Sequence, residues 1–274
     1  MDFQAILQFF STISLTSTAI YTSFTIIGCA LLIITLERIF PYKPQKFFRE
    51  GFFGDLFWYT LVQSYILSIL IFDVLIQWLD SASGLGRLHI ISHWPIWVQL
   101  VFFVLVHDCY IYWFHRFQHK NKYLWRIHEA HHSVKDIDWL AGSRSHSLEI
   151  LVNQTIEFAP MVLLGAPIEV LAWKGVIDAT TGMYIHCNID VRSGWLQYII
   201  NGPELHRWHH AHDKDAIDHN FSTKFAFWDY MFGTAFFPER VRKPIGYGLV
   251  RALEFPKNYF KQHLYAFRKH ERAK

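Results

Sequence analysis

Long uncharged stretches alternate with short polar segments along the first half of the chain. No charged residue occurs from Phe9 through Leu36, which is longer than the roughly 20 residues that span the hydrocarbon core of a bilayer. Two further apolar stretches run from Leu56 to Leu79, interrupted only by Asp73, and from Trp94 to Val106. The pattern predicts three membrane-spanning helices, over residues 12–36, 54–79 and 94–114.

A fourth apolar stretch, from Phe158 to Ile185, is interrupted by helix breakers and charged residues. The interruptions are Pro160, Gly165, Pro167, Glu169, Lys174, Gly175 and Asp178. Such a segment can enter the membrane and return, provided that its freed backbone groups are buried in protein. The alternative is a soluble protein with fully buried core helices, but aromatic residues at the ends of the stretches favour bilayer interfaces. We therefore expect an all-α membrane fold with about four embedded segments.

The composition supports a membrane location and excludes several other classes. Of 274 residues, 52% are apolar and only 18% are charged, against about a quarter charged in soluble domains. The net charge of +3 suits an anionic membrane surface and is too small to indicate nucleic-acid binding. The sequence contains no glycine-rich nucleotide-binding loop, so we expect no NAD or flavin site. The three cysteines lack the paired spacing of a disulfide framework or a thiolate metal motif.

The distribution of basic residues predicts the orientation. Four of them occupy the loop after the first predicted span: Arg38, Lys43, Lys46 and Arg49. The segment 80–93 carries only Arg87. Because positive loops stay in the cytoplasm, we expect the N terminus outside and the third span to return the chain to the cytoplasm. The start lacks the features of a cleaved secretory signal, so we expect a retained anchor. We expect one domain over 1–274 with a basic cytosolic tail from about 238, in the inner membrane if the source is bacterial.

Eight of the 17 histidines lie in three short stretches. The stretches are His115-Arg-Phe-Gln-His119, His128-Glu-Ala-His131-His132 and His206-Arg-Trp-His209-His210. Offsets of three and four residues return a side chain to the same face of a helix, so helices should carry all three boxes. Eight imidazoles exceed what one tetrahedral ion binds, which predicts two metal ions with open coordination positions. A single pair could arise by chance, but the repeated H-x-x-H-H pattern is poorly explained that way.

Two histidines outside the boxes are further candidate ligands. His186 ends the fourth apolar stretch, where a polar ring needs a partner. His146, in a turn-rich segment, could reach the metals or merely cap a helix. The predicted metal ligands are His115, His119, His128, His131, His132, His146, His186, His206, His209 and His210. The sequence indicates no catalytic residue beyond them.

Because imidazole is neutral, bridging oxygen ligands or nearby carboxylates must balance the metal charge. Asp108, Asp218 and Asp229 are candidates to orient imidazole rings through hydrogen bonds. A helix cap or a surface charge is the alternative for each aspartate. The remaining histidines are expected to be surface or structural residues: His89, His93, His107, His212, His219, His263 and His270.

Five motifs together resemble the fatty acid hydroxylase and sterol desaturase superfamily. They are YWFHRFQH from Tyr112, HEAHHS from His128, HRWHH from His206, IDHNF from Ile217 and WDYMFGT from Trp228. The resemblance covers about 105–237 and is closest to the bacterial sterol-desaturase-like branch, with some similarity to alkylglycerol monooxygenase. One departure is Ser222, where relatives often carry glycine, which puts that local turn in doubt.

The resemblance implies a helical membrane protein with a cytosolic histidine-rich cap. It also implies a non-heme diiron centre that uses O2 to hydroxylate or desaturate a lipid. The implied partners are a lipid substrate and an external electron donor of the cytochrome b5, ferredoxin or reductase type. Since nitrogen ligands bind zinc more tightly than ferrous iron, purified protein could carry zinc. The residues themselves do not specify the lipid.

Two alternatives from other functional classes remain open. His128-Glu129-Ala130-His131-His132 also matches the H-E-x-x-H motif of zinc metalloproteases, with Glu129 as the base. That interpretation leaves His115, His119 and the third box without a role. The other alternative is a non-catalytic membrane carrier of metal or heme, which a Soret band in purified protein would favour.

Overall fold

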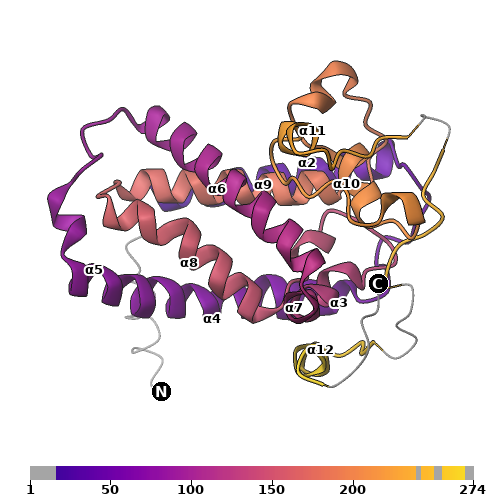
Figure 1. Cartoon of the computed structure of the whole chain (residues 1–274), viewed down its shortest axis with the longest axis horizontal. Helices are drawn as coiled ribbons and strands as arrows, with labels where there is room; N and C mark the ends of the chain where they lie inside the picture. The colour runs from indigo at the N-terminus through magenta and orange to yellow at the C-terminus, as the bar shows by residue number, and fades with distance from the viewer. Residues whose placement is uncertain (1–16, 239–241, 250–254, 269–274) are drawn as a thin grey trace.

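The computed structural model describes residues 17–238, 242–249 and 255–268. Within these ranges the chain is helical, and the only β pairing is two isolated bridges, Pro41 with Ile189 and Ala211 with Tyr247. Long helices lie side by side, and short helices and loops gather at one end of them (Figure 1). The all-α prediction is confirmed.

Three helices are long and apolar enough to cross a membrane. They are α2 (Ser17–Ile39), a continuous helix over residues 52–83, and α6 (Ile96–Lys120). The second consists of α3 (Phe52–Gly54), η1 (Asp55–Gln63), α4 (Ser64–Ser68), η2 (Ile69–Ile76) and α5 (Gln77–Ser83), with η1 and η2 π-helical. The three predicted helices are confirmed with shifted ends, and residues 12–16 of the first lie outside the described residues.

The fourth apolar stretch forms the end of one helix and most of a second. They are α8 (Ser147–Leu163), which contains Pro160, and α9 (Ile168–His186). The turn between them uses Gly165 at φ +77°, a left-handed conformation that glycine adopts without steric cost. The Ala166 N–H donates to the Met161 carbonyl, which satisfies a backbone group freed at the end of α8. The breakers therefore divide the stretch between two helices, and its entry into and return from the membrane stays a prediction.

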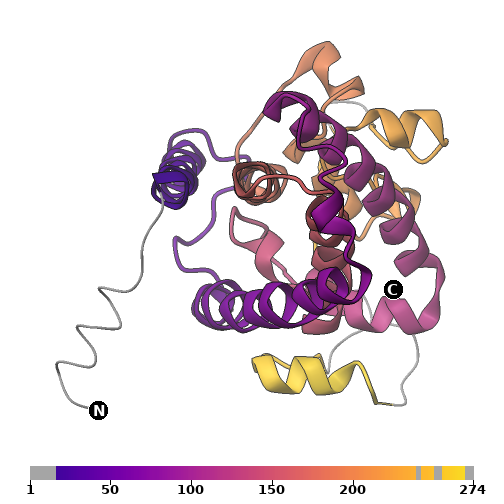
Figure 2. The same cartoon turned by 90° about the vertical axis from the view of Figure 1, so that its left-hand side faces the viewer.

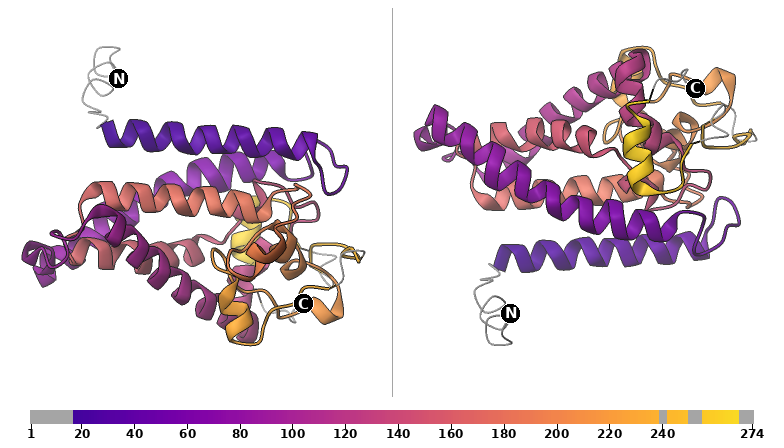
Figure 3. Two further views of the ribbon diagram at one scale, coloured as in Figure 1. Left: turned by 90° about the horizontal axis from the view of Figure 1, so that it is seen from above. Right: turned by 90° about the horizontal axis from the view of Figure 1, so that it is seen from below.

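The core of the embedded part lies between the second span, α6, α8 and α9. Ile71, Phe103, Met161 and Val170 are buried there in one apolar cluster. The α2 helix lies at the edge of the molecule and packs along α9 (Figures 2 and 3). Many large apolar side chains on the outward faces stay exposed, including Phe24 of α2 and Trp97 of α6. A lipid environment would cover such faces.

All the remaining described elements except η3 form a cap where α6 ends and α9 ends (Figure 1). The helices are α7 (Lys122–His132), α10 (Pro203–His209), α11 (Phe227–Met231) and α12 (Tyr259–Tyr265). The 3-10 turns are η3 (Leu85–Leu88), between the second span and α6, and η4 (Ala141–Ser143), η5 (Gly194–Tyr198) and η6 (Lys214–Ala216) in the cap. Pro203 begins α10, as expected for a residue whose missing N–H costs nothing at the first helical position.

Candidate metal centre

The first two histidine boxes face each other because the chain turns sharply after α6. Asn121 ends α6 and caps α7, and its side chain accepts hydrogen bonds from the Tyr123 and Leu124 N–H groups. The turn places His115 Nε2 3.0 Å from His128 Nε2. One helical turn further along α6, His119 Nε2 lies 3.2 Å from His132 Nε2.

Nine buried histidines form two groups whose ligand atoms lie within 4.8 Å of one another in each group. The first group consists of His115, His119, His128, His132 and His209. The second group consists of His131, His186, His206 and His210. The groups are neighbours, since the rings of His132 and His210 are 4.5 Å apart between centroids. Nine of the ten predicted ligands are therefore brought together, and they divide into two sites.

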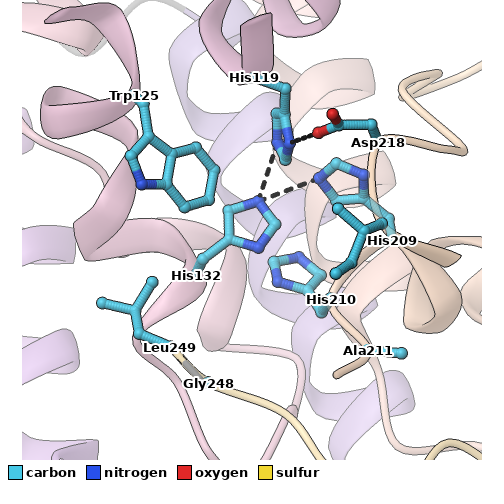
Figure 4. A pocket seen from close by; sticks show the side chains of 10 residues that line it. His119, Trp125, His132, His209, His210, Ala211, Asp218, Gly248 and Leu249 are labelled. Carbon is cyan, nitrogen blue, oxygen red and sulfur yellow. Dashed lines mark hydrogen bonds and ion pairs between the residues drawn. The ribbon is translucent and has the colours of Figure 1, made fainter. Parts of the chain in front are cut away.

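The third box completes both groups. In the first group, His209 Nε2 lies 3.1 Å from His132 Nε2, and Figure 4 shows these two rings turned toward His119. In the second, His206 Nε2 lies 2.9 Å from His186 Nε2 and 3.2 Å from His210 Nε2. His206 and His209 stand on α10, and His210 is the residue that ends it. Helices α6 and α7 carry the other two boxes, as predicted.

The hydrogen bonds of the outer ring nitrogens point the free nitrogens inward. The Nδ1 atom contacts a backbone carbonyl in four of the nine rings: His115 with Phe221, His131 with Arg144, His186 with Gly182 and His209 with His219. A carbonyl only accepts, so each Nδ1 must carry the proton and each Nε2 must carry a lone pair. Such outer contacts fix the tautomer and orientation of metal-binding histidines.

The spacing and the protonation of the rings fit bound metal ions. Nitrogens bound to one ion at about 2.1 Å lie roughly 3.0–3.4 Å apart for angles of about 90–109°. Four of the five contacts between ring nitrogens above fall in that range, and the fifth, between His186 and His206, is slightly shorter at 2.9 Å. Burial, reinforced by neighbouring imidazoles, lowers the pKa of His131, His132 and His210 well below the usual value. Burial likewise lowers the pKa of His209 to about 3. Neutral imidazoles turned toward one another are suited to share cations.

Two carboxylates touch rings of the first group. Glu149 of α8 has Oε1 2.9 Å from His128 Nδ1, and Asp218 has Oδ1 3.4 Å from His119 Nδ1. Asp218 was among the three aspartates expected to orient imidazoles. Glu149 was missed, because nothing in its local sequence shows that α8 packs against α7.

Asp108 and Asp229 contact the loop over residues 221–229 instead of an imidazole. Asp229 accepts from the Phe221 and Ser222 N–H groups at 2.8 and 2.9 Å. Asp108 of α6 accepts from the Lys224 and Phe225 N–H groups and from the side chains of Thr223 and Trp228. Both act on the site indirectly, since the Phe221 carbonyl holds His115. The expectation of direct contact with a ring is met by Asp218 alone of the three.

Ser222 is buried in this loop and donates its backbone N–H to Asp229. Among the described residues, the non-glycine positions with positive φ are His89, Asp218 and Asn220. Ser222 therefore needs no left-handed conformation, and the turn forms without glycine.

His146 lies outside both histidine groups. Its Nδ1 accepts from the Leu148 N–H and caps α8, and its ring packs 4.5 Å from that of His263. Of the two roles considered for His146, the structure places it in the helix cap. His107 and His263 are half-buried and belong to neither histidine group, and His270 lies outside the described residues.

Cavities adjoin the site on two sides. The larger, of about 230 Å³, runs between α6, α8 and α9, and five rings from both groups line one part of it. These are His115, His128, His131, His186 and His206. The smaller, of about 40 Å³, lies beyond His119, His132 and His209 and is bordered by Trp125, Asp218 and Leu249 (Figure 4). Histidines of both groups therefore border a cavity between α6, α8 and α9.

Comparison with known proteins gives one matching family model. Residues 100–234 match the model described as fatty acid hydroxylase. The chain is 30% identical over 215 residues to ornithine lipid hydroxylase OlsE of Rhizobium tropici. The aligned region covers 76% of this chain and 65% of OlsE.

Alkylglycerol monooxygenases are also similar. The zebrafish (Danio rerio) protein is 32% identical over 170 residues, covering 60% of this chain and 36% of its own length. The human protein is 31% identical over 142 residues, covering 52% of this chain and 31% of its own length. The chain thus spans about two thirds of the first relative and about one third of the others. No solved structure matches the chain.

Proposed function

This chain belongs to the fatty acid hydroxylase family, and we propose that it is an O2-dependent lipid hydroxylase of the membrane. The observation that carries the proposal is the pair of buried histidine groups, which adjoin one cavity between membrane-embedded helices. Two sites side by side suit a dinuclear centre, in which both ions act on one small molecule. Iron is the proposed metal, because the family resemblance implies a diiron enzyme.

The nine histidines of the two groups are the proposed ligands, and His146 is left out because it caps α8. Two iron ions held there would supply the activation of dioxygen. Inserting one oxygen atom into a C–H bond, while the other is reduced to water, consumes two electrons and two protons. An external donor of the cytochrome b5, ferredoxin or reductase type is therefore part of the proposal.

The protein's own residues position the ligands and exclude water. The backbone carbonyls of Phe221, Arg144, Gly182 and His219 fix four of the rings before any ion binds, and Glu149 fixes a fifth. Rings locked in this way lose little freedom on metal binding, and the burial of both groups keeps bulk water from the reacting carbon.

The proposed substrate is a membrane lipid. By their names, the relatives hydroxylate ornithine lipids or oxygenate alkylglycerols, and both compounds join hydrocarbon to a polar group. The histidine groups lie at the ends of α6 and α9 and on α7 and α10. The basic residues of the loop after α2 support a cytoplasmic location for this end of the molecule, which is part of the proposal.

A zinc protease is a weaker proposal on geometric grounds. His128 and His132 of the H-E-x-x-H motif lie in a group with three further imidazoles, whereas a protease zinc has three protein ligands and an open position for water. A Glu129→Gln variant tests this alternative, because it should abolish a protease and leave an oxygenase able to load metal.

The deciding experiment compares lipids extracted from cells with and without the gene, each grown with and without oxygen. The proposal predicts that one lipid class gains the mass of a single oxygen atom only when both gene and oxygen are present. An unchanged lipid profile from cells that contain folded, iron-loaded protein would overturn the hydroxylase assignment. Iron without lipid oxidation, or a Soret band, would favour a carrier.

A further inference from the structure

The larger cavity reaches a buried ionic cluster at a distance from the histidine groups. This cluster consists of His107 of α6, Glu157 of α8, Lys174 and Asp178 of α9, and Lys224. The Lys174 ammonium contacts the carboxylates of Glu157 and Asp178, and the Lys224 ammonium lies 2.6 Å from Asp178. Two cations and two carboxylates balance, so the cluster needs no further ion. The Lys174 ammonium also occupies the position where His107, Glu157 and Asp178 could hold a metal.

One hydrogen-bond donor of this cluster, the Nε2–H group of His107, has no acceptor among the described residues. Lys174 Nζ lies 3.1 Å from His107 Nδ1, and an ammonium group only donates, so Nδ1 accepts and the ring proton is on Nε2. The His107 side chain is 10% exposed, and its Nε2 has no hydrogen-bond partner within the described part of the chain. A buried donor without an acceptor costs about 1–3 kcal/mol. An acceptor supplied by a ligand would recover that free energy.

The wall of the cavity is polar in other places as well. Asn153 and Gln154 of α8 line it, as do Gln118 and Glu149. Gln118 Nε2 and Glu149 Oε2 are buried and have no partner among the residues described. A cavity shaped for a plain hydrocarbon chain would not place polar side chains along its length, because each loses hydration without gaining a bond. The lining instead suits a molecule that carries oxygen atoms close to the reacting carbon.

We propose that His107 binds a neutral, oxygen-bearing polar group of the lipid substrate, such as a hydroxyl, ether, ester or amide oxygen. This rests on the proposed lipid hydroxylase function. The group is neutral because the surrounding charges already balance, which disfavours a carboxylate or a phosphate at this position. His107 and His115 are eight residues apart on α6, which corresponds to about 12 Å. The oxidised carbon therefore lies within about 12 Å of that oxygen, not at the far end of a long chain.

The experiment locates the inserted oxygen in the lipid. Full-length wild-type protein and a His107→Leu variant are produced in cells, and the altered lipid is analysed by tandem mass spectrometry for the position and yield of the new hydroxyl. In the wild type, the hydroxyl should lie within about 12 Å along the chain from an existing neutral oxygen. The variant should lower the yield at least about tenfold, or spread the hydroxyl over several carbons, with unchanged iron content.

Matched variants and a second measurement keep the result interpretable. His107→Gln retains a donor and should keep most of the regiochemistry, whereas His93→Leu makes the same change at an exposed histidine that lines neither cavity and should match the wild type. Lipids that co-purify with the wild-type protein should be enriched in the oxygen-bearing class, and this enrichment should fall in His107→Leu. If His107→Leu does not fold, the position of the hydroxyl in wild-type cells decides, since the inference requires it within about 12 Å of a neutral oxygen.

Two results would overturn the inference. Equal yield and position in wild type and His107→Leu, with equal iron, would mean that the ionic cluster only clamps α6, α8 and α9 together around water. A hydroxyl at a carbon more than about 12 Å from every neutral oxygen of the lipid would also overturn the inference. If wild-type cells show no oxidised lipid at all, the hydroxylase proposal itself has failed, and the two failures are thereby distinguished.

Discussion

Glu149 and His128 are joined by a 2.9 Å contact between Oε1 and Nδ1, although they stand on different helices, α8 and α7. The contact turns the Nε2 atom of His128 toward His115, its partner in the first histidine group. A carboxylate behind a metal-binding imidazole fixes the ring and raises its basicity. Glu149 thus links α8 to the proposed metal site.

We expect Glu149→Ala to weaken iron binding about 10- to 100-fold, the usual effect of removing a partner behind a ligand. Glu149→Gln keeps an acceptor oxygen and should lose less. Metal titration of purified protein, read by iron analysis after gel filtration, measures the change. If both variants bind iron like the wild type, Glu149 has no role in orienting His128.

His209→Ala should remove iron from the first group and abolish lipid hydroxylation, because His209 Nε2 faces His132 at 3.1 Å. His212→Ala is the matched control: His212 follows the same box, but its Nε2 contacts the Gly248 carbonyl instead of either group. The control should keep its iron and its activity. Equal loss in both variants would indicate general disruption of the cap and not a ligand role for His209.

Asp229→Ala should destabilise the protein by about 2–4 kcal/mol. Its buried carboxylate accepts from two backbone N–H groups and from the Thr234 hydroxyl, and such bonds to a charged group contribute about 1.5–3 kcal/mol each without adding fully. Thermal unfolding in detergent measures the loss. Asp215→Asn removes a carboxylate whose side chain is 67% exposed and should leave the unfolding temperature within error.

Removing the metal should lower the unfolding temperature of the protein, and adding ferrous iron should restore it. Ions that bind only the folded state stabilise it by mass action, and without them nine neutral rings face one another with their lone pairs uncompensated. Chelator treatment followed by calorimetry tests this. An unfolding temperature indifferent to chelator and to iron would argue that the histidine groups do not bind metal in the folded protein.

The proposed cytoplasmic location of the cap predicts which side of the membrane single cysteines occupy. Lys46→Cys, in the exposed loop after α2, should resist a membrane-impermeant thiol reagent in intact spheroplasts and react after lysis. Ser83→Cys, exposed at the opposite end of the second span, should react in intact spheroplasts. The reverse labelling pattern would place the histidine groups outside the cytoplasm.

The spans and the histidine boxes could be predicted from the sequence because both are local properties. Hydropathy over about 20 residues indicates a span whatever surrounds it, and the i, i+3 and i+4 spacing in the boxes places rings on one face of a helix without knowledge of its neighbours. The eight histidines of the boxes meet in space for that reason, and they are joined by His186, which was predicted from its place at the end of an apolar stretch. The sequence could not decide the tenth, His146, because it lies in a turn where a histidine can either cap a helix or bind a metal.

Tertiary packing decided everything that joins one segment to another. The division of the rings into two groups depends on the Asn121 turn and on where α10 docks, and neither Glu149 nor the ionic cluster around Lys174 can be deduced from local spacing. Sequence periodicity specifies which face of a helix a side chain occupies, but not which helix that face meets. The residues that orient the rings and line the cavity become recognisable only when α6, α7, α8 and α9 are packed together.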